Sequence, residues 1–194
     1  MKNKKMQERP SIEQLQTELE RVEYKKRYRT VLKSTIYSLI TVAAVAVLIA
    51  TLWLPVLEIF GESMTPTLQD GEIVFSLKTN QLEKGDIVAF YYNNKILVKR
   101  VIAGPGEWID SIDEDGNVSV NGQIIEEPYL EEKAFGDADI EFPYQIPDGK
   151  FFVMGDHRST SVDSRHTVIG CVSEEQIVGR IVFRVWPLKA FGTV

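Results

Sequence analysis

The longest uninterrupted apolar stretch of the chain runs from Ser34 to Leu57 and contains no charged residue. About 20 helical residues suffice to cross the roughly 30 Å hydrocarbon core of a bilayer. A cleaved leader would have a shorter apolar region, about 7 to 15 residues, followed by a small-x-small site. Phe60-Gly61-Glu62 matches such a site poorly. The pattern therefore predicts an uncleaved transmembrane helix over residues 34–57.

The segment before this stretch predicts a further helical element. Ser11 and Gln14 have the spacing of a capping box, and apolar residues recur after Ser11 at intervals of three and four, namely Ile12, Leu15, Leu19 and Val22. Two heptads are too short to establish a coiled coil. We therefore interpret residues 1–33 as a cytoplasmic segment with an amphipathic helix, in water or on the membrane surface, with self-association as the alternative.

After the anchor, the pattern changes to short runs rich in Val, Ile, Phe and Tyr between turn residues, which is typical of strands. These runs are Ile73 to Leu77, Asp86 to Tyr92, Lys95 to Ala103, Phe151 to Met154 and Val178 to Trp186. Asn93-Asn94 and Asn121-Gly122 have the composition of two-residue hairpin turns. We therefore expect residues 58–194 to form a mostly β domain.

One section of this domain is strongly acidic. Residues 104–150 contain thirteen Asp and Glu against two lysines, and turn residues stand at both ends, in Gly104-Pro105-Gly106 and Pro147-Asp148-Gly149. This acidic section predicts a small lobe inserted into the β domain. Its charge argues against nucleic-acid binding.

The two flanks of the apolar stretch differ in charge, which predicts an orientation. The first basic residue after the stretch is Lys78, whereas six basic residues stand before it, namely Arg21, Lys25, Lys26, Arg27, Arg29 and Lys33. Basic residues near a span favour the cytoplasmic side. We therefore expect a single-pass protein of the cell membrane with a cytoplasmic N-terminus and an extracytoplasmic β domain.

Cysteine and histidine are scarce. Cys171 is the only cysteine, so no disulfide can form within the chain, and the two histidines hardly complete a structural zinc site. We expect neither a metal nor a cofactor, and we interpret Cys171 as a small buried hydrophobe.

Two residues could carry nucleophilic chemistry. Ser63 follows the anchor closely, although a serine before a Pro-containing turn is more often a surface hydroxyl that satisfies local backbone groups. Lys99 shares a strand face with Leu97 and Val101 by the two-residue period. Burial there should lower its pKa from about 10.4, so that the neutral amine can act as a base. The alternative is a lysine that extends to water over an apolar strand.

A third cluster, Gly155 to His166, mixes acids, bases and hydroxyls. It could form a hydrogen-bonded floor under a site or a solvated turn. It also permits a Ser-His-Asp triad, in which His157 or His166, together with Asp156 or Asp163, would serve Ser63. Composition alone does not choose between these interpretations.

Four boxes in sequence order resemble the motifs of bacterial type I signal peptidases. They are Ser63 to Leu68, Gly85 to Val88, Val98 to Val101 and Gly155 to Arg165. The resemblance implies a mostly β fold, with a single N-terminal transmembrane helix followed by a β-rich catalytic domain that carries a small inserted lobe and rests an apolar face on the membrane. It also implies a membrane-bound serine endopeptidase.

The resemblance also implies roles for particular residues. Ser63 matches the nucleophile and Lys99 the general base of a dyad that forms an acyl-enzyme and needs no histidine, metal or cofactor. Supporting positions match Ser161, whose hydroxyl would orient the lysine, and Asp163, Arg165 and Asp156. Positions that line small-residue pockets match Ile59, Met64, Leu68 and Val98.

Two positions depart from the family pattern. Gly61 stands where some relatives carry a serine that adds a hydrogen-bond donor for the oxyanion. His157 stands where asparagine is common. The first departure leaves no side-chain hydroxyl to supply the extra donor, and the second leaves the dyad intact.

The implied substrates are secretory precursors held in the lipid bilayer by signal peptides and cut on the outer side after small residues, as in Ala-x-Ala sites. The secretion machinery is a further implied partner. Two other classes compete with this interpretation. One is a non-catalytic signal-peptidase-like assembly factor for surface proteins, against which the presence of both Ser63 and Lys99 weighs. The other is a membrane-tethered regulator that cleaves itself by the same Ser-Lys chemistry.

Overall fold

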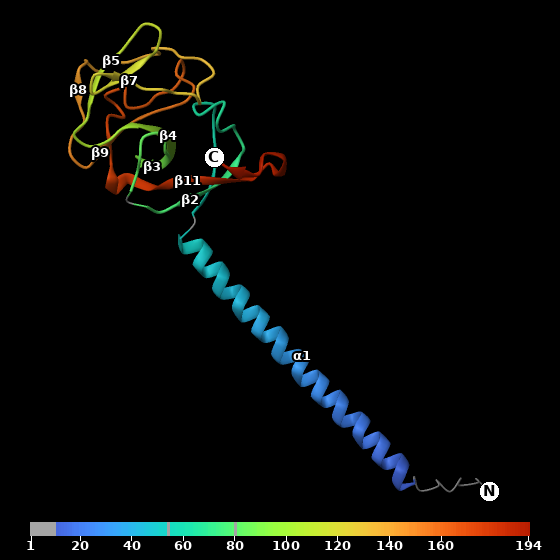
Figure 1. Ribbon diagram of the computed structural model, residues 1–194. Coiled ribbons are helices and arrows are strands. Elements are labelled where there is room, and N and C mark those ends of the chain that lie inside the picture. Colours follow the sequence, from blue (N-terminus) through green and yellow to red (C-terminus); the bar gives the residue numbers. More distant parts are fainter. Residues whose placement is uncertain (1–10, 54, 80) are drawn as a thin grey trace. The chain divides into compact units, whose positions relative to one another are not determined.

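The computed structural model describes residues 11–53, 55–79 and 81–194. The chain divides into two compact units, one that ends at Ile49 and one that begins at Ala50. Figure 1 shows a long helix in the first unit and a set of strands in the second.

The helix α1 (Ile12–Trp53) is continuous. It begins with the expected capping box, in which the Gln14 N–H donates to Ser11 Oγ at 3.2 Å and the Ser11 N–H donates to Gln14 Oε1 at 3.0 Å. No glycine or proline interrupts it, so the two helical elements expected from the sequence form one helix. By length and composition, its described part from Ile12 to Ile49 can cross a membrane.

The helix ends earlier than predicted. The expected span reached Leu57, whereas α1 stops at Trp53 and residues 56–58 form strand β1 (Val56–Glu58). Pro55 lacks a backbone N–H and its ring clashes with the preceding helical turn, so the helix cannot continue through it.

The second unit is mostly β, as predicted. Its larger sheet has the order β1-β2-β11-β3-β4-β9-β10, and β12 pairs with β11. All neighbouring strands in it are antiparallel. After β1, its strands are β2 (Ile73–Leu77), β3 (Ile87–Tyr92), β4 (Lys95–Ala103), β9 (Lys150–Met154), β10 (Val172–Ser173), β11 (Ile177–Trp186) and β12 (Gly192–Thr193).

The five predicted strands are confirmed to within one residue at each end, as β2, β3, β4, β9 and β11. Both predicted hairpin turns are also present. Asn93 joins β3 to β4 with a φ of 51°, and Asn121 joins β6 (Val118–Val120) to β7 (Gln123–Ile124) with a φ of 53°. Tight hairpin turns need this left-handed backbone, which asparagine tolerates.

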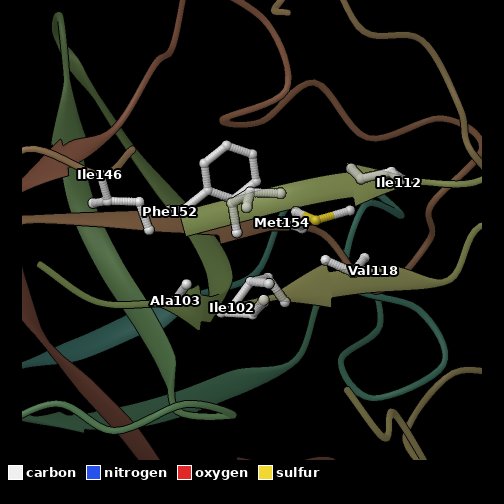
Figure 2. Packing of buried hydrophobic residues seen from close by; sticks show 9 residues of the cluster. Ile102, Ala103, Ile112, Val118, Ile146, Phe152 and Met154 are labelled. Atoms are coloured by element: carbon white, nitrogen blue, oxygen red, sulfur yellow. The ribbon is translucent and has the colours of Figure 1, made fainter. Parts of the chain in front are cut away.

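A second sheet lies within the acidic section. It has the order β7-β6-β5-β8, with β5 (Trp108–Ile112) and β8 (Tyr144–Gln145). Its apolar side chains share one core with β4 and β9, where Ile112 and Val118 pack in the same cluster as Ile102, Phe152 and Met154 (Figure 2). The acidic section is therefore packed against the larger sheet, and its status as a separate lobe stays a prediction.

Strand β3 is buried on both faces, which explains its uniformly apolar run. Ile87 and Ala89 belong to one core cluster, together with Ile59, Met64 and Leu68, whereas Val88 and Phe90 belong to another. The connection between β1 and β2 therefore packs on one face of the larger sheet. Two short 3₁₀ helices complete the unit, η1 (Glu174–Gln176) and η2 (Leu188–Ala190).

Candidate active site

Ser63 lies in the connection between β1 and β2, within a tight series of turns. The Thr65 N–H and hydroxyl both donate to the Glu62 carbonyl, at 3.1 and 2.8 Å, and the Leu68 N–H donates to the Met64 carbonyl at 2.8 Å. Met64 and Leu68 are buried in the core. Their burial fixes the backbone on the C-terminal side of Ser63.

Lys99 extends from β4 and meets Ser63. Its Nζ donates to Ser63 Oγ at 2.6 Å, although 36 residues separate them in the sequence. The expected strand face is consistent with the packing, since Leu97 and Val101 contact the same core cluster. Lys99 is only 4% exposed.

Burial lowers the pKa of Lys99 from 10.5 to about 8. Desolvation disfavours the ammonium form and is the largest cause. The charge of Asp163 raises the pKa, that of Arg165 lowers it and that of Asp156 raises it. About a tenth of the amine is therefore neutral at pH 7, far more than for a lysine with an ordinary pKa.

The loop of residues 155–165, which follows β9, packs against the nucleophile's backbone. The His157 N–H donates to the Ser63 carbonyl at 3.1 Å. A Cβ on Gly155 would overlap both the Ser63 carbonyl oxygen and the Ser161 hydroxyl. Ser161 Oγ is buried, and its hydroxyl lies near enough to the Asp163 carboxylate to help lower the pKa of that group, although no hydrogen bond of ordinary geometry reaches it within the described part of the chain. Only glycine fits at position 155 without displacing these groups.

Two arginine-carboxylate pairs stabilise this loop. Arg165 pairs with Asp163 through Nε at 2.8 Å and Nη2 at 2.9 Å, and Asp163 also accepts the Gly155 N–H at 3.0 Å. Burial would raise the pKa of Asp163, but the hydrogen bond and charge of Arg165 outweigh it and hold that pKa below its usual value. Arg100 pairs with Asp156 through Nε at 2.8 Å and Nη2 at 2.5 Å.

Neither histidine reaches the Ser63 hydroxyl among the described residues. His157 Nδ1 lies 3.2 Å from Thr65 Oγ1, and His166 Nε2 lies 3.6 Å from Asp137 Oδ2. The Ser-His-Asp triad that the composition permitted is therefore not assembled around Ser63. Where the structure is described, no group of three or more His, Cys, Asp or Glu residues could hold a metal ion.

A cleft of about 710 Å³ lies beside Ser63 and Lys99. One wall is formed by residues 57–61, 63 and 64, and the other by residues 94–99. Three of the four predicted pocket residues line it, namely Ile59, Met64 and Val98. Leu68 does not line it and is instead fully buried, in the same core cluster as Ile59 and Met64.

One edge of this cleft is an unpaired strand edge. β4 pairs with β3 from Lys95 to Arg100, whereas its pairing with β9 begins only at Arg100. Among the described strands, none pairs with the second edge of β4 from Lys95 to Lys99. Backbone groups on this edge are free to pair with an extended peptide.

Sequence reasoning missed two parts of this network. No role was assigned to Arg100 within the Val98 to Val101 box, yet it is buried and pairs with Asp156. Glu127 and Arg158 form a fully buried ion pair. One signal was available, since Arg158 belongs to the box that begins at Gly155, but nothing marked Glu127 among the thirteen acids of its section.

Known proteins resemble this chain in sequence over most of its length. The description "Signal peptidase, peptidase S26" applies to the family that matches residues 32–186. Signal peptidase IB of Staphylococcus aureus strain Mu50 is 41% identical over 152 residues, which cover 68% of this chain and 77% of that protein. Signal peptidase I T of Bacillus subtilis strain 168 is 39% identical over 142 residues, covering 66% and 72%.

These matches cover most of the chain. It therefore belongs to the signal peptidase family, peptidase S26, and is a serine peptidase, a hydrolase. A crystal structure of a signal peptidase I from Enterococcus faecalis V583 has 27% sequence identity to it and a TM-score of 0.44, and covers 52% of this chain and 96% of that one.

Proposed function

We propose that this protein removes N-terminal signal peptides from exported precursors, with Ser63 as nucleophile and Lys99 as general base. The observation that carries the proposal is the 2.6 Å contact between Lys99 Nζ and Ser63 Oγ, made by an amine whose pKa is lowered to about 8. A serine hydroxyl is a weak nucleophile unless a neighbouring base accepts its proton. The names of the relatives supply the substrate class.

In the first half of the reaction, the neutral Lys99 amine accepts the Ser63 proton as Oγ attacks the scissile carbonyl carbon. The resulting oxyanion lies within reach of the Ser63 backbone N–H, which serves as a donor. Gly61 has no side-chain hydroxyl to add a second donor. The Lys99 ammonium then protonates the leaving amine, and the signal peptide remains as an ester on Ser63.

In the second half, Lys99 removes a proton from water, and the hydroxide attacks the ester. Breakdown of that intermediate returns the proton to Ser63 Oγ and releases the signal peptide. Asp163, Arg165 and Asp156 set the charge around Lys99. Ser161 packs against the Gly155 peptide beside Asp163, and its hydroxyl would orient the amine during the reaction.

The cleft supports an extended substrate. The precursor would pair with the free edge of β4 beside Val98 and place its small side chains against Ile59 and Met64. Leu68 would support these residues from the core. A cleft walled by such bulky apolar side chains favours Ala-sized residues next to the cut.

The anchor supports a membrane location. We propose that α1 spans the bilayer with its basic N-terminal flank in the cytoplasm, so that the β unit lies outside, where exported precursors emerge. Partners would then be the bilayer, the precursors and the secretion machinery.

The test is cleavage of a precursor with an Ala-x-Ala site by the purified full chain in detergent. Wild type should release the mature protein, and Ser63→Ala should not. Thr167→Ala is a suitable control, because Thr167 is an exposed hydroxyl that hydrogen-bonds Asp139, away from the cleft. An assembly factor without catalytic activity would leave the precursor intact in every variant, and a self-cleaving regulator would cut only its own chain.

A further inference from the structure

Three buried arginines stabilise the loop of residues 155–165, Arg100 from outside it and Arg158 and Arg165 from within it, and each also contacts the acidic section. The segment that holds them is residues 127–136, here called the brace. Arg100, Arg158 and Arg165 are 7%, 1% and 0% exposed. The proposed function uses their carboxylate partners Asp156 and Asp163, but it gives the brace no role.

Glu127 holds Arg158. Its carboxylate accepts both terminal nitrogens of that arginine, Nη1 at 3.1 Å and Nη2 in a shorter bond, and neither side chain is exposed. Arg158 Nε in turn donates to the Gly155 carbonyl at 3.0 Å. Glu127 is thus two contacts away from the glycine that packs against the Ser63 backbone.

Tyr129 contacts both Arg100 and Glu127. Its ring lies 3.8 Å from the Arg100 guanidinium carbon, a cation–π contact, and its hydroxyl donates to Glu127 Oε1 at 2.8 Å. Arg100 donates two hydrogen bonds to the Asp156 carboxylate, one from Nε and one from Nη2. Tyr129 therefore fixes the plane of the guanidinium that orients Asp156, the residue after Gly155.

The end of the brace contacts Arg165. The Phe135 carbonyl accepts Arg165 Nη1 at 2.5 Å. At Gly136 the backbone runs so close to the Arg158 carbonyl and to Arg165 Nη1 that a Cβ would overlap both, and its φ of 68° also favours glycine. The brace thus contacts the loop at a third point.

We propose that the brace positions the Gly155–His157 peptide, and through it the Ser63 backbone, for catalysis, with Glu127 and Tyr129 as positioning residues. This inference rests on the proposed function. Three arginines and three carboxylates, Glu127, Asp156 and Asp163, form the buried network. Removing the charge of Glu127 leaves Arg158 uncompensated, so that it competes for the carboxylates on which Arg100 and Arg165 depend.

The test compares Glu127→Gln with Glu126→Gln in the full chain in detergent. Glu126 is the neighbouring exposed glutamate and serves as the matched control. Two quantities are measured: kcat and KM on a precursor peptide with an Ala-x-Ala site, per folded molecule, and amide hydrogen exchange over residues 155–165. Wild type and Ser63→Ala are run beside them.

Glu127→Gln should lower kcat between about tenfold and a hundredfold, since a misplacement of about 1 Å can cost about 10²-fold. KM should stay close to wild type, because the brace does not line the cleft. Exchange over residues 155–165 should become faster, and Glu126→Gln should change neither quantity. Tyr129→Phe, which removes only the hydroxyl bond to Glu127, should shift both in the same direction by a smaller factor.

If amide hydrogen exchange over residues 155–165 is unchanged in Glu127→Gln, the positioning role of the brace is refuted, whatever the activity. An unchanged kcat per folded molecule accompanied by a lower melting temperature would refute it too, because the ion pair would then serve stability alone. A raised KM with an unchanged kcat would also overturn it. If Glu127→Gln does not fold, the same criteria apply to Tyr129→Phe. If wild type fails to cleave, the proposed function is refuted, and the exchange measurement alone decides whether the brace holds the loop.

Discussion

Lys99 is the residue on which the proposed chemistry depends. It lies on β4, its amine is 2.6 Å from Ser63 Oγ, and 4% of its surface is exposed. An amine in this setting is held in place and poorly solvated, so it can exchange a proton with the hydroxyl without a rearrangement of the backbone.

Replacing Lys99 should abolish cleavage. Lys99→Ala removes the base, and loss of a general base costs on the order of 10² to 10⁴ in rate. Lys99→Arg should be as inactive, because a guanidinium keeps its proton. The measurement is precursor cleavage by each purified variant, with folding checked by circular dichroism. His157→Ala and His166→Ala should keep substantial activity. An inactive histidine variant beside a near-normal Lys99→Ala would instead favour the triad.

The pH dependence should follow Lys99. Burial lowers the pKa of Lys99 to about 8, and only the neutral amine accepts a proton. The active fraction therefore rises as pH increases through about 8 and is lost as pH falls below it. We expect kcat/KM, which reports the free enzyme, to fall about tenfold per pH unit well below that value. An acid limb centred near the ordinary histidine pKa of about 6.5, and absent in His157→Ala, would contradict this.

At the scale of elements, the loop after β9 and the edge of β4 form the site together. β9 leaves β4 beyond Arg100, and its chain continues into the loop that holds the Ser63 carbonyl and Lys99's charged neighbours. Because β9 ends there, the edge of β4 from Lys95 to Lys99 has no partner strand among the described residues along the cleft. One change in strand pairing would thus provide both the support of the proposed Ser63-Lys99 dyad and the place where the proposed substrate binds.

Gly155→Ala tests the contact between this loop and the nucleophile. The added methyl would overlap the Ser161 hydroxyl and the Ser63 carbonyl oxygen, so the loop must move away from Ser63. We expect a loss of at least about tenfold in kcat, measured on the precursor peptide with the fold checked by circular dichroism. Gly104→Ala is the matched control, since its Cβ would find its nearest atoms at 3.8 Å. Equal activity of the two variants would show that the loop does not position Ser63.

At the scale of the whole molecule, the proposed enzyme combines an apolar helix that would anchor it in the membrane with a β unit that carries the proposed catalytic residues. Both enzyme and precursor would be confined to one bilayer, which raises their effective concentration without any added contact. In the proposed topology, the basic residues before the span would determine which side of the membrane the β unit occupies, because basic flanks prefer the cytoplasm.

The orientation can be tested on intact, wall-stripped cells. Protease added outside should remove the β unit and leave a membrane-bound fragment that contains α1, because residues 58–194 are expected outside. The readout is the size of the fragment detected through an N-terminal tag. A β unit that survives until the membrane is opened would place it in the cytoplasm and exclude the proposed substrates.

Much of this architecture was predictable because it depends on residues close together in the chain. The helix signals at Ser11 and Gln14, the apolar stretch and the five longer strands all depend on local periodicity. The strands that were not assigned are short, two to five residues, which is too little for a periodic pattern to stand out. They exist because their neighbours pair with them, as β1 does with β2.

The candidate site divides in the same way. Its box residues were matched by resemblance, which also paired Ser63 with Lys99, 36 residues away. Nothing in the sequence paired Glu127 with Arg158, 31 residues away, or Arg100 with Asp156, 56 residues away. Local propensity carries no information about such distant partners. Strand order and register decide which side chains meet. Only the folded chain therefore shows that the amine of Lys99 lies against the hydroxyl of Ser63, that Leu68 belongs to the core and that the acidic section reaches the loop behind the nucleophile.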